Sequence, residues 1–92
     1  MRVRFTAIHL VGGIRHEHIA NLKAVDATTG APYQDTRANW VAWMEQKGNS
    51  SFVQDNYGNR AEVGVRSNGN TKWLQTYADK VWTDNLLALP RY

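Results

Sequence analysis

Hydrophobic and polar residues alternate along several stretches of the chain, which is the pattern of half-buried β-strands. Residues 2–11 begin with arginines at alternate positions and become more apolar toward Gly12 and Gly13, which allow the positive φ of a chain reversal. The returning segment 16–26 fits less cleanly, because its apolar residues are spaced by three. The glycine turn before it favours a second strand with a bulge near Asn21, so we expect a β-hairpin at the start of the chain.

The second half of the chain carries the clearest alternation. Residues 51–54 form a short apolar run, and after a polar turn residues 60–67 place alanine and valine on one face. Asn68-Gly69 is typical of a two-residue type I′ hairpin turn. We therefore expect a further strand over residues 71–78.

One stretch has helical periodicity. Asp35 or Thr36 can cap a helix that runs to about Lys47 and ends at Gly48. Its apolar side chains, which include two tryptophans, fall on one face and are expected to fill the core. The preceding residues 27–34 contain glycine and proline, so we expect a loop there.

The C-terminal residues 81–92 are rich in leucine and aromatic side chains, and such a segment is expected to dock on the rest of the molecule. Thr83 or Asp84 can cap a single helical turn in it. The resulting order β-β-α-β-β-β predicts the α+β class: a small antiparallel sheet of about five strands with one helix packed on one face. We expect residues 1–92 to form a single compact domain.

Composition narrows the functional classes. The chain has 92 residues, a formal net charge of +3 and no cysteine, so disulfides, thiol catalysis and thiolate metal sites are excluded. The apolar stretch near the N-terminus is too short for a signal sequence or a membrane span, and we expect a cytoplasmic protein without membrane association. The glycines do not form a phosphate-binding loop or a dinucleotide-binding fingerprint.

His16, Glu17 and His18 are three chemically capable side chains in a row. If the segment is extended, the two imidazoles project to one face about 7 Å apart and could share a divalent metal ion. A third ligand would have to come from His9, Asp79 or Asp84. Because an H-x-H pair alone is weak evidence, we expect neither a bound metal nor a cofactor. The simpler interpretation is that these side chains hydrogen-bond the backbone or the C-terminal segment.

Asp79, Asp84 and Asn85 form a second polar group near the C-terminus. Two carboxylates near histidines could act as an acid and a base. Asp and Asn more often cap turns by bonding their own backbone, and we favour this structural role. If the C-terminal segment meets the histidine triplet, the two motifs form one latch between the first strands and the tail.

The outward face of the predicted sheet is basic. The side chains that can project there together are Arg2, Arg4, Arg60, Arg66 and Lys72. Tyr57, Tyr77 or Trp82 could lie at its edge, and a basic sheet with aromatic platforms can bind single-stranded nucleic acid or phosphates. The alternative is an ordinary solvated face of an antiparallel sheet.

Three motifs together resemble a known family: a Gly-Gly turn with an HEHI segment, a strand with lysine, an aromatic residue, leucine and threonine, and a tail with DNLL-x-LP. The matching residues are Gly13, His16, Glu17, His18, Ile19, Lys72, Trp73, Leu74, Thr76, Ala78, Asp79, Asp84, Asn85, Leu86, Leu87, Leu89 and Pro90. The chain is similar to small bacterial and phage proteins grouped only as a domain of unknown function. The resemblance implies a compact α+β domain in a cytoplasmic or phage-encoded protein and carries no activity.

These observations favour a non-enzymatic binding module, whose partner is another protein or a nucleic acid bound at the basic face. Exposed edges of a small sheet also favour a homodimer by strand pairing. Two alternatives remain: a metal-assisted enzyme that uses His16, Glu17 and His18, and a phage-type inhibitor that binds a host protein.

Overall fold

The computed structural model describes residues 1–78 and 81–92. The strands are β1 (Arg2–Leu10), β2 (Ile19–Asp26), β3 (Pro32–Thr36), β4 (Ser50–Gln54), β5 (Arg60–Ser67), β6 (Lys72–Ala78) and β7 (Val81–Thr83). The helical elements are the α-helix α1 (Arg37–Met44) and the short 3-10 helices η1 (His16–His18) and η2 (Asn85–Ala88). Across this part of the chain, no helix combines the length and the apolar character that crossing a bilayer requires.

The strands form one mixed sheet of seven strands in the order β3-β2-β1-β4-β5-β6-β7. The small α+β class with one helix is confirmed, but the sheet is larger than the expected five strands. The expected loop over residues 27–34 contains the start of β3, and the tail contributes β7. The sheet is also not purely antiparallel, because β1 and β4 run parallel.

The first two strands form the predicted antiparallel hairpin. Its register shifts between His9 and Leu10, where residue 20 of β2 is unpaired, so the bulge expected near Asn21 is confirmed. Gly12 has the predicted positive φ of +78°. The connection is not a tight turn, however, because residues 11–18 form a wider loop closed by a 2.9 Å hydrogen bond from the Val11 amide to the His18 carbonyl.

Helix α1 begins where the sequence predicts it. Thr36 is the N-cap, and its side chain accepts a hydrogen bond from the Asn39 amide. The helix ends at Met44, earlier than the expected Lys47, and residues 45–48 form turns instead. Trp40 is buried, as predicted.

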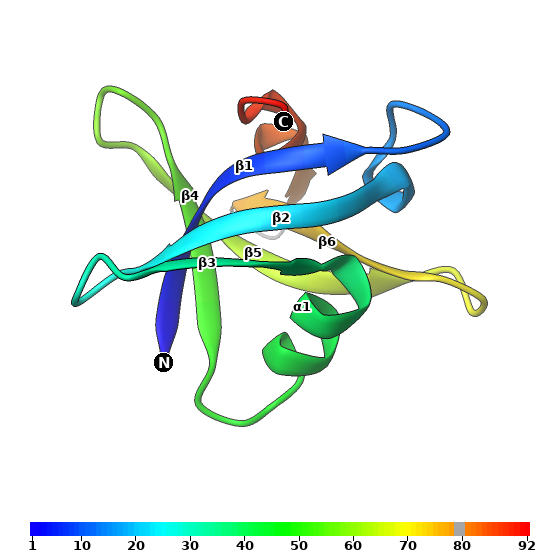
Figure 1. The fold of residues 1–92 in the computed structure, drawn as a ribbon. Coiled ribbons are helices and arrows are strands. Elements are labelled where there is room, and N and C mark those ends of the chain that lie inside the picture. Colours follow the sequence, from blue (N-terminus) through cyan, green and yellow to red (C-terminus); the bar gives the residue numbers. More distant parts are fainter. Residues whose placement is uncertain (79–80) are drawn as a thin grey trace.

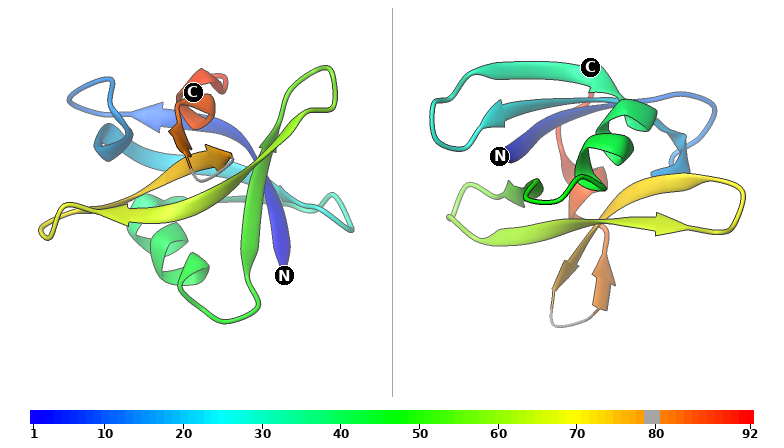
Figure 2. Two further views of the ribbon diagram at one scale, coloured as in Figure 1. Left: turned by 180° about the vertical axis from the view of Figure 1, so that it is seen from behind. Right: turned by 90° about the horizontal axis from the view of Figure 1, so that it is seen from below.

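The core lies inside the curl of the sheet. Figure 1 and the right-hand view of Figure 2 show α1 between the β2–β3 side and the β5–β6 side of the sheet, with the C-terminal segment on another side of the core. Trp40 packs edge-on against Phe5 at 5.1 Å between ring centroids, and its indole nitrogen donates to the Leu22 carbonyl. The buried core consists of Val3, Phe5, Ile8, Ile19, Leu22, Ala24, Trp40, Val41, Val53, Ala61, Val63, Leu74 and Leu86.

The β5–β6 hairpin is confirmed, but its turn differs from the predicted type. Ser67 pairs with Lys72, so four residues connect the strands instead of two. The Asn68 side chain accepts hydrogen bonds from the backbone amides of residues 70 and 71. Asparagine therefore closes this loop with its side chain, which a two-residue turn would not require.

The C-terminal segment docks on two strands, as its apolar character predicts. Leu86 is fully buried, and the Ile8 amide donates to the Pro90 carbonyl at 2.9 Å. Asp84 lies at the N-cap position of η2, but its side chain forms no capping hydrogen bond. The Asn85 amide instead donates to the buried Thr76 hydroxyl at 3.1 Å.

Candidate binding surface

One row of side chains crosses the sheet on the face opposite the core. In register, Arg4 of β1 pairs with Phe52 of β4, Phe52 with Glu62 of β5, Glu62 with Tyr77 of β6, and Tyr77 with Trp82 of β7. Because side chains alternate between faces along a strand, their neighbours two positions away share this face. We call this surface the arginine–aromatic face; it comprises Arg2, Arg4, Phe52, Arg60, Glu62, Arg66, Trp73, Tyr77 and Trp82.

Two arginines cover an apolar ring at one end of this face. The guanidinium carbons of Arg2 and Arg60 lie 4.4 and 4.6 Å from the centroid of the Phe52 ring, which is buried beneath them. Arg2 also forms a two-pronged ion pair with Glu62 at 2.7 and 2.6 Å. The hydrogen bonds from Arg2 lower the pKa of Glu62, and those to Glu62 raise the pKa of Arg2. Arg2 is thus largely neutralised, whereas the Arg60 side chain donates to the neutral Gln54 side chain.

Two half-exposed aromatic rings form the other end. Tyr77 and Trp82 are 40% and 39% exposed, and their rings meet edge-on at 5.6 Å between centroids. The Arg66 guanidinium lies 4.8 Å from the Trp82 ring centroid. At Gly64, a Cβ atom would approach the Trp82 ring to 3.1 Å and the Tyr77 ring to 3.3 Å. Glycine at this strand position therefore lets both rings lie across β5.

Lys72 lies apart from the four arginines of the predicted basic face. It is two residues from the buried Leu74 and therefore points toward the helix side of the sheet. There its ammonium group pairs with the Glu45 carboxylate at 2.8 Å. The other four predicted basic residues share the arginine–aromatic face.

The histidine triplet does not have the extended geometry that a shared metal site would need. His16, Glu17 and His18 form η1, so the two imidazoles do not alternate with Glu17 as on a strand. The His18 ring accepts a hydrogen bond from the Arg15 amide at 3.2 Å, and Arg37 donates to the Glu17 carbonyl. Within residues 1–78 and 81–92, no three His, Asp or Glu side chains are grouped as a metal site would require.

His16 is buried, and its Nε2 atom has no hydrogen-bond partner among the residues described. Burial lowers the pKa of His16; the carboxylates of Asp84 and Glu17 act in the opposite direction, and the Arg66 charge lowers the pKa further. The charge of Asp84 therefore acts on the triplet across the fold. Asp79, the other carboxylate of the proposed latch, lies outside the described residues.

The hydrogen bonds that hold the tail run to β1 and β6. The Tyr92 amide donates to the Ile8 carbonyl at 3.0 Å, and His9 Nδ1 donates to a Tyr92 main-chain oxygen. The Lys23 ammonium group lies 4.3 Å from the centroid of the Tyr92 ring. Burial raises the pKa of the Tyr92 hydroxyl. His9, which the sequence suggested as a metal ligand, thus contacts the tail.

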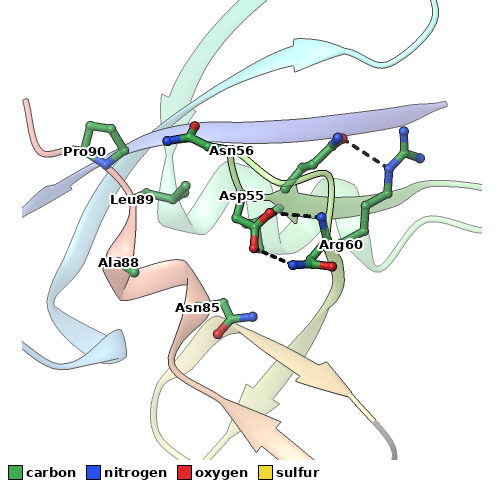
Figure 3. Close-up of a pocket in the computed structure, with 10 residues that line it drawn as sticks. Asp55, Asn56, Arg60, Asn85, Ala88, Leu89 and Pro90 are labelled. Atoms are coloured by element: carbon green, nitrogen blue, oxygen red, sulfur yellow. Dashed lines mark hydrogen bonds between the residues drawn. The ribbon is translucent and has the colours of Figure 1, made fainter.

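A cleft opens beside the arginine–aromatic face, between the β4–β5 hairpin and η2 (Figure 3). Its volume is about 480 Å³. The lining residues are Val53, Gln54, Asp55, Asn56, Asn59, Arg60, Asn85, Ala88, Leu89 and Pro90. Sequence reasoning identified Arg60 and Asn85 separately but not the cleft, because its walls are far apart in the chain. The only sequence signal was the run of turn-forming residues at 55–59.

The fold and this surface define a small α+β protein with one helix inside a curled mixed sheet and a charged, aromatic outer face. Residues 4–90 match the model of a family described as a protein of unknown function, DUF3892, and the chain belongs to this family. The resemblance to a domain of unknown function is confirmed at this level. No curated protein and no solved structure matches the chain.

Proposed function

We propose that this protein is a binding module whose arginine–aromatic face binds single-stranded nucleic acid. The observation that carries the proposal is the cross-strand arrangement of half-exposed aromatic rings beside arginines. Bases stack on aromatic side chains with a gain of about 1–3 kcal/mol each, and neighbouring cations neutralise the phosphates. Tyr77 and Trp82 offer such rings, and Arg66 lies against one of them.

The positions of the charges also support this proposal. The α-helix packs on the other side of the sheet, where the Lys72–Glu45 pair neutralises one cation. Among the described residues of the arginine–aromatic face, four arginines accompany a single carboxylate, that of Glu62. The formal net charge of +3 is modest, so base stacking must supply much of the affinity. Electrostatic attraction supplies the remainder.

Fluorescence anisotropy with labelled single-stranded DNA and RNA of about 15 nucleotides tests the proposal. We expect Arg66→Ala to weaken binding about fivefold, and Trp82→Ala by a similar or larger factor through lost stacking. Affinity should fall as salt rises from about 50 to 200 mM.

Lys47→Ala provides a matched control, because this exposed lysine lies in the turn after α1, away from the face. It removes one positive charge, as Arg66→Ala does, and should leave the affinity within about twofold. Equal losses in the two variants, or an affinity that does not change with salt, would contradict the proposal. Far-UV circular dichroism verifies that each variant is folded.

A further inference from the structure

We infer that the cleft between the β4–β5 hairpin and η2 binds a nucleobase, either of the strand on the arginine–aromatic face or of a free nucleotide. This inference rests on the proposed function and adds a specific subsite to it. The cleft combines an apolar wall with an amide-bearing rim (Figure 3). Val53, Leu89 and Pro90 form the apolar part, and Asn56 and Asn85 stand on opposite sides.

The two asparagines are free to bind a ligand. Neither the Asn56 nor the Asn85 side chain hydrogen-bonds to any residue that the structure describes, whereas the Asn59 amide nitrogen donates to Asp55 at 2.9 Å. Asp55 also accepts from the backbone amides of Tyr57 and Asn59 at 2.8 and 3.0 Å. These bonds lower the pKa of Asp55, with the Asn59 side chain as the largest cause. The hairpin is therefore held by Asp55, while Asn56 and Asn85 keep their donors and acceptors.

This chemistry fits a nucleobase. A base has two apolar faces and an edge on which donors and acceptors alternate, and a primary amide supplies one of each. Leucine and proline side chains can cover a base face, and amides on two sides can read its edge. A volume of about 480 Å³ lies within the range of small-molecule sites.

Arg60 connects the cleft to the arginine–aromatic face. It lines the cleft and also stacks on Phe52. The Trp82 ring lies over Gly64 of β5. The distance along β5 from Arg60 to Gly64 is about 13 Å. A strand that stacks on Trp82 can therefore continue to the cleft within a few nucleotides, with a phosphate against Arg60.

The experiment compares oligo(dA), oligo(dC) and oligo(dT) of equal length with the Asn56→Ala/Asn85→Ala variant. We expect the intact protein to discriminate among these homopolymers by about threefold or more, and the variant by less than about twofold. The salt dependence should not change, since no charge is removed. Asn70→Ala is the matched control, because this exposed asparagine lies in the loop at the other end of β5.

NMR spectra separate the outcomes. Free nucleoside monophosphates and oligonucleotides should both shift the side-chain amide signals of Asn56 and Asn85. If Arg66→Ala weakens oligonucleotide binding but the homopolymers bind equally and the amide signals do not move, the cleft inference is wrong and the proposed function stands. If monophosphates shift the amides but no oligonucleotide binds, the cleft takes a free nucleotide and the strand-binding function is wrong. If nothing shifts and nothing binds, both are wrong.

Discussion

His16 illustrates how one residue can link folding to pH. Its imidazole is buried by the rest of the fold, and burial lowers its pKa, partly opposed by Asp84 and Glu17. Since the pKa in the folded state lies below that in the unfolded chain, the unfolded state takes up a proton first as the pH falls. The stability contributed by neutral His16 is therefore complete above about pH 6.5 and is lost as the pH falls toward the lowered value.

We predict that His16→Leu makes the free energy of unfolding less dependent on pH between about 7.5 and 5. The variant also removes the buried Nε2 atom, which bonds none of the residues that the structure describes, so at neutral pH its stability should be equal or higher. Urea unfolding at a series of pH values measures both effects. His18→Leu is the comparison variant, since it makes the same substitution at a less buried ring of the same 3-10 helix. An unchanged slope in the His16 variant would show that another group causes the loss.

At the level of elements, one buried hydroxyl links β7 and η2 to β6, in addition to the backbone pairing of β6 with β7. Thr76 is fully buried, and its oxygen lies 2.6 Å from the Thr83 hydroxyl and 3.1 Å from the Thr83 carbonyl. It also accepts from the Asn85 amide. The Thr83 hydroxyl and the Asn85 amide thus bond the Thr76 side chain, and the Thr83 carbonyl accepts from both Thr76 and Gln75.

Thr76→Val keeps the shape of this side chain and removes the hydroxyl. Because the partly buried hydrogen bonds to the Asn85 amide and the Thr83 hydroxyl are lost, we predict a loss of about 1–3 kcal/mol in the free energy of unfolding. Chemical denaturation measures the loss, and Trp82 fluorescence should report a looser β7. Thr71→Val is the matched control, since the Thr71 hydroxyl bonds no residue within the described ranges. A loss below about 0.5 kcal/mol at Thr76 would mean that the tail is held chiefly by Leu86 and Pro90.

The sequence predicts elements well where packing and local pattern agree. The alternation of β5 and the Thr36 cap of α1 were both correct because each depends on contacts within a few residues. β3 was not predicted, and a loop was expected over residues 27–34, because all the residues of β3 are exposed and it has no apolar alternation. β7 has only three residues, too few to show any period.

The edge strand β3 is poorly suited to pair with a second copy of the chain. The Asp26 amide donates to the Ala31 carbonyl, and from there the backbone groups of β3 alternate between pointing toward β2 and pointing away from it. The backbone groups of Pro32, Gln34 and Thr36 point away from β2. Pro32 has no N–H, and the Thr36 amide donates to the carboxylate of the preceding residue at 2.8 Å. Of the three β3 residues that point outward, Gln34 alone then has a backbone N–H available to another strand. This edge disfavours strand addition, which supports a partner at the arginine–aromatic face instead.

The arrangement of the whole molecule depends on β1, whose contacts the sequence could not predict. The first part of β1 pairs in parallel with β4, and beyond the irregularity at residue 6 the Ile8 backbone pairs with the C-terminal tail. Both partners lie far along the chain, and no local pattern specifies them. The arginines of the arginine–aromatic face were predictable because their shared side follows from the alternation of side chains within single strands. The cleft was not predictable, because the residues that line it come from the β4–β5 hairpin and the tail, which lie far apart in the chain.

Charge over the whole surface gives the most direct test of where a polyanion binds. Glu62 is the carboxylate of the arginine–aromatic face, and its ion pair with Arg2 is 2.6 Å long. Glu62→Gln raises the net charge by one from +3 and releases Arg2. The half-exposed pair contributes under about 1 kcal/mol to stability, so the variant should fold. We predict that its affinity for single-stranded nucleic acid rises about threefold at low salt and that the salt slope steepens by up to about one.

Glu45→Gln makes the same change in net charge at a different place. It releases Lys72 on the helix side, where the pair distance is 2.8 Å and both side chains are similarly exposed. If nucleic acid binds at the arginine–aromatic face, this variant should change the affinity by less than about 1.5-fold, because screening weakens a charge on the far side of the sheet. Equal gains in the two variants would mean that net charge alone attracts the polyanion. If the affinity rises in the Glu45→Gln variant only, the nucleic acid binds on the helix side of the sheet.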